Sequence, residues 1–407
     1  MTIIEGHLAI SPPNNVPVWD IDPYDVEILK NPGEYYEELI AKGPFVYIPK
    51  YSVLACGRYQ EVKEVFSDWK RFVSSRGVGL NDFKLQKPWR DPSIILEADP
   101  PDHTKTRKIL SRVLSPKAVS ALKENFRKAA ESLIDELLKR EVFDAVTDMA
   151  EVFPTSVFPD FVGLKEVNKR YLIDYGATVF NALGPDNKLR RKAMDRAPEI
   201  VSWIMEQCER DNLSKHGMGA EIYSAADAGE ITEQEAGMLV RSLLSAGVDT
   251  TVTGIGSGIY CLAHNPDQFA LLKENPALAR QTFEEVLRFT SPVHSFCRTA
   301  NQDTTVSDVK IREGTKIICV LGAANMDETK WPEATKFDVG RKPIGHLAFG
   351  TGIHGCVGQN IARGEVEAIL TALARKVDTI EPAGEAVWRP NNAIHALGSF
   401  PVTFNNN

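Results

Sequence analysis

Residues 349–358 read F-G-T-G-I-H-G-C-V-G, and this stretch decides what the rest of the chain can build around it. Four glycines in ten positions exclude an ordinary helix or strand. Residues 359–376 predict a helix, so Cys356 is expected where a glycine-bent loop enters a helix. Free amides and the helix dipole favour a thiolate over a thiol there, and such a thiolate is a metal ligand or a nucleophile. The residues that recur at helical spacing are Ile361, Glu365, Ile369 and Leu373.

Three alternative interpretations of this loop remain open. Gly350, Gly352 and Gly355 match the G-x-G-x-x-G fingerprint of nicotinamide dehydrogenases, but that fingerprint needs an apolar strand before it. Residues 341–348 are polar and interrupted by proline, which argues against such a strand. A catalytic cysteine would need a histidine base, and no histidine is assigned to that role. An inert buried cysteine is the commoner fate of a lone cysteine.

The composition describes an ordinary globular protein. The 407 residues suffice for two or three average domains or one large one, and 43% are apolar and 25% charged. A net charge of −8 argues against nucleic acid as the main partner. No apolar run is long enough to span a bilayer, and the first twelve residues carry no signal-peptide pattern. The six cysteines form no C-x-x-C pair, which indicates reduced thiols and a cytoplasmic protein.

The chain shows no repeat, linker or domain boundary, so residues 1–407 are expected to form a single domain with a loose arm at 1–15. The longest predicted helix covers 232–264, where Thr232 and Glu235 form a capping box. Runs rich in β-formers predict a hairpin over 45–59. Other helices are expected at 60–69, 104–113, 116–139, 144–153, 166–183 and 195–211, and β-rich segments at 298–321 and 393–404.

As a whole, residues 349–358 resemble the haem-binding loop of the cytochrome P-450 family, Phe-Gly-x-Gly-x-His-x-Cys-x-Gly, at every defining position. The resemblance implies a mainly α fold with small β-sheets and one long central helix over the haem. It makes Cys356 the axial iron ligand of haem b, with Phe349 and Gly350 beside it and His354 bonded to a haem propionate. Because the chain has no C-x-x-C-H, the haem would be held without thioether links.

A second motif precedes the predicted helix at 104–113. Two prolines end one element, and Asp102 can cap the next helix. His103 and Arg107 are then i, i+4 neighbours, a pair that taken alone indicates only a solvated helix start. The segment resembles the family's Asp-Pro-Pro-x-His-x-x-x-Arg, whose His and Arg bind haem propionates. Arg298 resembles a third propionate contact.

Glu285 and Arg288 stand at i, i+3, where most such pairs are weak surface bridges. Here they match the family's Glu-x-x-Arg, a buried structural pair that Asp338 or Arg341 would complete. His294, in the next segment, is given no role.

The centre of the longest predicted helix reads A-G-V-D-T-T from Ala246. Gly247 weakens a core helix by about 1 kcal/mol, and Asp249 would be costly if buried without a partner. One interpretation is a local kink with Asp249 in solvent. The other is that Gly247 opens a groove for a ligand while Asp249 and Thr250 deliver protons. The stretch resembles the family's Ala-Gly-x-Asp-Thr, in which the threonine steadies bound oxygen and the acid relays protons for O–O cleavage.

A closer resemblance links the chain to bacterial P-450 enzymes that oxidise para-substituted benzoates, including 4-methoxybenzoate O-demethylases. It rests on residues 74–80, 87–90, 95–101 and 239–247. In that group an Arg and a Ser after a Pro-Trp pair, and a Ser on the central helix, bind the substrate carboxylate. These fall on Arg90, Ser93 and Ser242, with Arg241 beside them; alternatively, Arg90 and Ser93 only tie down a loop. Leu183 stands where the group usually has Phe, so a wider para pocket is expected. The other expected pocket residues are Leu96, Phe180, Ser245, Val248, Val293 and Phe296.

The resemblance implies a haem-thiolate monooxygenase that uses O2 to O-demethylate or hydroxylate a small aromatic carboxylate such as 4-methoxybenzoate. The chain holds no flavin or iron–sulfur module, so NAD(P)H electrons would arrive through an external [2Fe–2S] ferredoxin and its reductase. Arg363, Lys108 and Arg112 are candidate docking points. The alternatives are a monooxygenase for another small hydrophobic substrate, a peroxide-driven relative and a haem carrier without turnover. The Asp249–Thr250 pair argues against the last two.

Overall fold

The computed structural model of the chain describes residues 2–406, so Met1 and Asn407 of the expected domain lie outside the described residues. The fold is mainly helical, as the sequence predicts. No helix between residues 2 and 406 is long and apolar enough to cross a membrane. The α-helices are α1 (Val26–Lys30), α2 (Gly33–Lys42), α3 (Tyr59–Ser67), α4 (Asp102–Val113), α5 (Pro116–Leu137), α6 (Val152–Val162), α7 (Lys169–Asn181), α8 (Lys188–Gln207), α9 (Met218–Asp227), α10 (Glu233–Ala246), α11 (Asp249–His264), α12 (Pro266–Glu274), α13 (Ala279–Thr290), α14 (Leu321–Asn325) and α15 (Gln359–Lys376).

Within residues 2–406 the strands form five small sheets. The largest has the order β3-β4-β10-β7-β5, and all its pairs are antiparallel except β4 with β10. The others are β11-β14-β6, β12-β13, β8-β9 and β1-β2. The strands are β1 (Ile3–Ile4), β2 (His7–Leu8), β3 (Val46–Ile48), β4 (Val53–Cys56), β5 (Phe72–Val73), β6 (Phe143–Asp144), β7 (Ser295–Ala300), β8 (Thr304–Val306), β9 (Val309–Ile311), β10 (Lys316–Val320), β11 (Thr379–Pro382), β12 (Val387–Arg389), β13 (Ala396–Ser399) and β14 (Pro401–Asn405).

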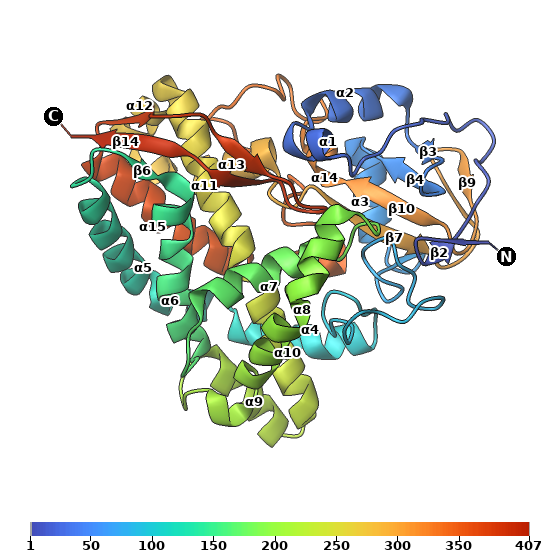
Figure 1. Ribbon diagram of the computed structural model, residues 1–407, viewed down its shortest axis with the longest axis horizontal. Helices are drawn as coiled ribbons and strands as arrows, with labels where there is room; N and C mark the ends of the chain where they lie inside the picture. The colour runs from blue at the N-terminus through green and yellow to red at the C-terminus, as the bar shows by residue number, and fades with distance from the viewer. Residues whose placement is uncertain (1, 407) are drawn as a thin grey trace.

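Figure 1 shows two regions side by side. The five-stranded sheet with α1, α2 and α3 makes one side of the molecule, and α5, α6, α11 and α15 make the other. The largest apolar core lies in the helical region, and smaller cores pack on the sheet. Helix α11 contacts α7, α13 and α15, so the predicted central segment is at the middle of the helical core.

Several predicted elements are confirmed with their local causes. The hairpin over 45–59 is β3 and β4. Helix α15 covers 359–376 as predicted, and its face of recurring residues is buried. Ser115 caps α5 by accepting the Ala118 amide, and Pro116 is the first helical residue, where its missing N–H costs nothing. Helix α8 begins at Lys188, before the expected 195, because the Asn187 side chain caps it.

The prediction of a loose arm at 1–15 is wrong for the described residues. Strands β1 and β2 form a hairpin whose turn residues, Glu5 and Gly6, have positive φ values of 48° and 80°. The Gly6 carbonyl accepts the Asp82 amide at 3.0 Å, and the Glu5 carboxylate accepts the Asp186 amide at 2.9 Å. The arm is therefore tied to two segments distant in sequence.

Three further expectations need correction. The helix expected over 144–153 is instead the end of β6, a π-helix η1 (Ala145–Ala150) and the start of α6. Asp102 does not cap α4, since Pro101 occupies the cap position and Asp102 is already helical. The helix expected over 232–264 has its capping box at Thr232 but breaks between Ala246 and Asp249 into α10 and α11.

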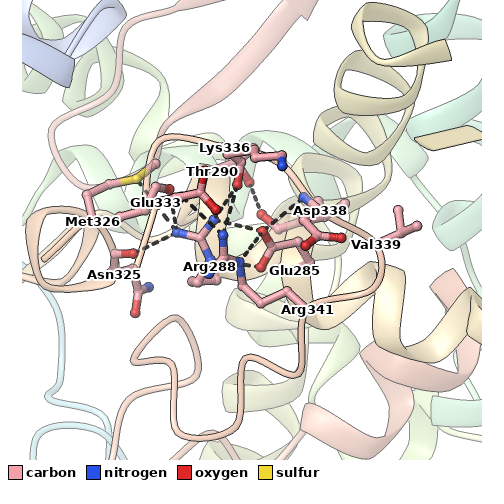
Figure 2. A network of polar contacts seen from close by, with 12 residues as sticks. Glu285, Arg288, Thr290, Asn325, Met326, Glu333, Lys336, Asp338, Val339 and Arg341 are labelled. Carbon is pink, nitrogen blue, oxygen red and sulfur yellow. Dashed lines mark hydrogen bonds and ion pairs between the residues drawn. The ribbon is translucent and has the colours of Figure 1, made fainter. Parts of the chain in front are cut away.

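Figure 2 shows the buried network that joins α13 to the loop before the cysteine stretch. Glu285 and Arg288 are both 0% exposed and share two hydrogen bonds of 2.8 Å. Arg288 also donates to two carbonyls of the 325–334 segment at 3.0 and 2.8 Å. Arg341 Nε donates to the Glu285 carboxylate at 3.1 Å, and the Asp338 amide donates to the same carboxylate at 3.3 Å. The expected structural pair is present, and both suggested residues complete it, one by side chain and one by backbone.

Candidate active site

A cavity of about 250 Å³ connects the glycine loop to the central helices. Its wall includes Cys356, the 242–251 region of α10 and α11, loop residues between 90 and 96, and Arg298. Of the expected pocket residues, Arg90, Ser93, Leu96, Phe180, Leu183, Ser242, Ser245, Val293 and Phe296 line it. Of the expected cofactor and oxygen residues, Cys356, Arg107, Arg298, His354, Phe349, Gly350, Ala246 and Thr250 line it.

The glycine loop holds Cys356 at the start of α15. Gly350 and Gly352 have φ values of 67° and 69°, a conformation that side chains disfavour. A β-carbon on Gly352 would also meet the Ser67 Cα at 2.9 Å. The Cys356 amide donates to the Phe349 carbonyl at 2.8 Å and closes the loop. The sequence predicts this backbone arrangement because the positive φ values at positions 350 and 352 both favour glycine.

The thiol is less acidic than the helix start alone predicts. Burial raises the pKa of Cys356, and this outweighs the opposing effects of the Gly358 and Gln359 amides and the Arg107 and Arg363 guanidinium groups. The amides that favour a thiolate are thus present, but they do not suffice without a further cation at the sulfur. A bound metal ion would supply that charge.

Two arginines and two histidines gather near the glycine loop. Arg107 donates to the Gly355 carbonyl at 2.6 Å, and Arg298, 1% exposed, lies 4.1 Å from the centre of the Phe66 ring. The His103 and His354 rings are 4.4 Å apart. Burial lowers the pKa of His354 and that of His103, the latter to about 4, so both rings are neutral at pH 7.

This group fits the propionate end of a haem. Neither histidine Nε2 has a hydrogen-bond partner within residues 2–406, although both atoms are buried. The nearest carboxylate to His354 is Asp99, whose Oδ1 lies 3.6 Å from Nε2, beyond hydrogen-bond length. Buried polar atoms normally find partners, so these two nitrogens indicate a bound acidic group. His103 is not itself in the cavity wall but packs against His354, with the two ring planes tilted by 55°.

The break in the central helix surrounds Gly247. A β-carbon there would collide with the Phe158 ring, so the room that Gly247 leaves is taken by this ring. Thr250 lines the cavity, and its hydroxyl donates to the Ala246 carbonyl at 2.7 Å. The hydroxyl therefore satisfies a carbonyl at the point where the helix is interrupted.

Asp249 is buried, which excludes the interpretation with this side chain in solvent. It is 1% exposed and does not line the cavity. Its Oδ1 accepts from Arg389 Nη2 of β12 at 2.8 Å, and its Oδ2 has no partner within residues 2–406. The Arg389 side chain is 29% exposed, and Asp249 raises its pKa. The ion pair thus joins a residue next to Thr250 to a partly solvated cation.

The far end of the cavity is polar and positively charged. The Arg90 side chain is 8% exposed, and its Nη2 lies 3.7 Å from Glu97 Oε2. Ser93 Oγ accepts the Leu96 amide at 3.2 Å, so its O–H can donate to a ligand. The Ser242 hydroxyl donates to the Met238 carbonyl at 2.9 Å and would have to rotate to bind an anion.

The structure places two expected pocket residues outside the cavity wall. Arg241 is 3% exposed and donates to the Asp91 and Pro92 carbonyls at 2.9 and 3.3 Å, so it supports the loop from behind. Val248, 0% exposed, lies within the break and belongs to the large apolar core.

Sequence reasoning missed Arg389 and Glu97. Arg389 pairs with a residue 140 positions away, and nothing in its local sequence marks it. Glu97 lies inside the quoted 95–101 run, and its position four residues after Ser93 is a weak local signal for a turn contact.

The comparisons with known proteins agree with this geometry. A family model described as cytochrome P-450 matches residues 164–397. The chain is 50% identical to cytochrome P-450 CYP199A2 of Rhodopseudomonas palustris over 388 residues, which cover 95% of this chain and 94% of that protein. It is 28% identical to the biotin biosynthesis cytochrome P-450 of Bacillus subtilis, over 93% and 97% of the two chains. The solved structure of cytochrome P-450 CREJ with (4-ethylphenyl) dihydrogen phosphate has a TM-score of 0.86 at 25% identity and covers 94% of this chain and 99% of its own. The chain therefore belongs to the cytochrome P-450 family, whose members are monooxygenases that use haem b and receive NAD(P)H electrons through redox partners.

Proposed function

We propose that this monooxygenase oxidises a small aromatic carboxylic acid at its para substituent, by O-demethylation or hydroxylation, with 4-methoxybenzoate as the reference substrate. The observation that carries the proposal is a single cavity wall that contains both Cys356 and the buried Arg90. Arg107 and Arg298, which also line the cavity, are assigned to the haem propionates, so Arg90 is the lining cation left for an aromatic body that carries one anionic group. The CREJ structure holds (4-ethylphenyl) dihydrogen phosphate, a para-substituted ring with an acidic group, which supports this ligand class.

The spacing along α10 and α11 suits such a ligand. Ser242 and Thr250 both line the cavity, Ser242 from α10 and Thr250 from α11, eight positions apart in sequence. A benzoate ring can lie between them, with its carboxylate at Arg90 and Ser93 and its para group toward Thr250. Leu183, at the position where the resemblance implies a Phe, also lines the cavity, and its smaller side chain leaves room for a larger para substituent.

Haem, when bound, supplies a thiolate-ligated iron at which O2 is activated. Cys356 would be its ligand, and the Arg107, Arg298, His103 and His354 side chains would bind its propionates. The apolar wall orients the ring and keeps water from the reacting carbon. The residues that line the cavity come from positions between 66 and 362. We therefore further propose that residues 1–407 form a single haem domain.

We further propose that two side chains move protons. Thr250 lines the cavity, and its hydroxyl oxygen, which donates to the Ala246 carbonyl, can still accept a hydrogen bond. The neighbouring Asp249 has one carboxylate oxygen on Arg389 and one without a partner among the described residues. We assign Asp249 to carry protons inward from the partly solvated Arg389 side, and Thr250 to hold a proton donor in the cavity.

A [2Fe–2S] ferredoxin and its reductase are the redox partners we propose. Of the candidate docking residues, Lys108 is exposed. Arg112 pairs with Glu230 at 2.8 Å, and Arg363 pairs with Glu284. An acidic partner would therefore have to share two of these cations with carboxylates already in place.

A spectral titration of the haem-loaded protein tests the substrate class. We expect 4-methoxybenzoate to shift the iron to high spin, and its methyl ester to do so at least about thirtyfold more weakly. With a surrogate ferredoxin system, 4-methoxybenzoate should yield 4-hydroxybenzoate and formaldehyde in equal amounts. Equal responses to acid and ester would remove the carboxylate proposal and leave the family assignment intact.

A further inference from the structure

A buried carboxylate lies beside the cationic end of the cavity, next to Arg90 and outside the cavity wall. Glu97 is buried, with its side chain 5% exposed, and its Oε2 lies 3.7 Å from Arg90 Nη2. The same oxygen accepts the Ser93 amide at 2.7 Å, and the Glu97 amide returns a bond to the Ser93 carbonyl at 2.9 Å. Glu97 thus faces the guanidinium that would bind the substrate, in a position fixed by the loop.

A second cation stands behind this pair. Arg241, 3% exposed, donates to the Asp91 carbonyl at 2.9 Å, and Arg90 Nη1 donates to the same carbonyl at 3.2 Å, so the two guanidinium groups are neighbours. Arginine keeps its charge even when buried, so both guanidinium groups count as positive. The buried Tyr175 hydroxyl, near the same three groups, stays neutral because burial raises its pKa. The cluster therefore contains two positive charges and one negative charge.

We propose that Glu97 determines how many negative charges the pocket accepts. With Glu97 ionised, Arg90 and Arg241 leave one uncompensated positive charge, which one monoanionic group neutralises. A dianion would leave a buried excess of negative charge, which is costly. Glu97 is a positioning and specificity residue that acts through Arg90, and this inference rests on the proposed binding of an aromatic acid.

A purely structural role for Glu97 makes a different prediction. If its task were only to accept the Ser93 amide, glutamine would serve as well, because its side-chain oxygen is also an acceptor. Glu97→Gln therefore keeps the loop bond and removes the charge. Glu97→Asp keeps the charge and gives up the loop bond, because its side chain is shorter.

The experiment measures dissociation constants by titration calorimetry at pH 8 for 4-methoxybenzoate and for 4-methoxyphenyl phosphate, which carries two charges at that pH. The wild type should prefer the benzoate. Glu97→Gln should shift the preference toward the phosphate by about tenfold or more, the effect of one unit charge within several ångströms in a partly buried site. Glu97→Asp, and Glu124→Gln on the exposed surface of α5, should keep the wild-type preference.

A double variant tests the charge count itself. Arg241→Gln combined with Glu97→Gln restores one net positive charge, and should return the preference to the benzoate. An unchanged preference in Glu97→Gln, or a double variant that behaves like Glu97→Gln alone, would overturn the inference. If instead the wild type binds benzoate and its methyl ester equally, the proposed substrate class fails, and the two failures are distinguishable.

Discussion

Replacing Arg90 by methionine removes the positive charge at the acid end of the cavity and keeps an apolar side chain of similar length. Losing one partner of a buried charge pair costs about 2–5 kcal/mol. The Arg90 side chain is 8% exposed, but Glu97 at 3.7 Å already shares its charge, so we expect the lower half of that range. About 2–3 kcal/mol raises the dissociation constant for 4-methoxybenzoate about 30- to 150-fold.

The same change leaves Glu97 buried without its cation, which should destabilise the fold by about 3 kcal/mol. The double variant Arg90→Met with Glu97→Gln removes both charges. It should recover most of the stability but only part of the acid affinity, because Arg241 stands behind the cavity wall. Thermal unfolding measures the loss of stability separately from the loss of acid affinity.

The assay compares the acid with its methyl ester in all three proteins, by titration calorimetry and by the spin-state change. Arg90→Met should weaken the acid and leave the ester within about twofold. A loss of less than about threefold for the acid, an equal loss for both ligands, or full recovery of acid binding in the double variant would refute direct binding of the carboxylate by Arg90.

Three further predictions concern the iron ligand, the proton path and the buried network. Cys356→Ser should abolish the Soret band that marks thiolate ligation in the reduced carbon monoxide complex; a surviving band would contradict the assignment. Arg389→Gln releases Asp249 from its 2.8 Å ion pair, and should slow turnover about tenfold and raise the yield of hydrogen peroxide relative to product, whereas Arg389→Lys should stay near the wild type. An unchanged ratio of peroxide to product would exclude this residue from proton delivery. The Arg288 side chain is 0% exposed, so Arg288→Met should lower the free energy of unfolding by about 3–5 kcal/mol. The Arg341 side chain is 14% exposed, so Arg341→Met should lower it by about 1 kcal/mol. Urea unfolding followed by haem absorbance measures both losses. Equal losses of stability would show that the difference in burial between the two arginines does not set the cost of losing each one.

The features that the sequence predicts well are those encoded within a few neighbouring residues. The glycine loop follows from backbone conformations that need glycine, and α15 from the spacing of its buried face. The capping box at Thr232 and the hairpin of β3 and β4 are likewise local. The Glu285–Arg288 pair is also local in spacing, although its burial depends on distant carbonyls.

The features that were missed depend on partners far away in sequence. The N-terminal hairpin is ordered by Asp82 and Asp186, which nothing in residues 1–15 indicates. Asp249 pairs with Arg389 across 140 positions, and periodicity does not show that the Phe158 ring packs where a side chain at 247 would lie. Arg241 is expected beside the pocket by resemblance and Val248 in its apolar wall, but Arg241 is held by the Asp91 and Pro92 carbonyls and neither residue lines the cavity.

The contact between Gly247 and Phe158 affects how mutagenesis of this region should be interpreted. An alanine scan through residues 242–251 would find a strong loss at 247 and suggest that this position takes part in chemistry. The loss would instead report a methyl group driven into an aromatic ring. Combinatorial libraries aimed at new substrates should therefore keep glycine here, or vary it only together with a smaller residue at 158, so that screening effort is not spent on misfolded clones.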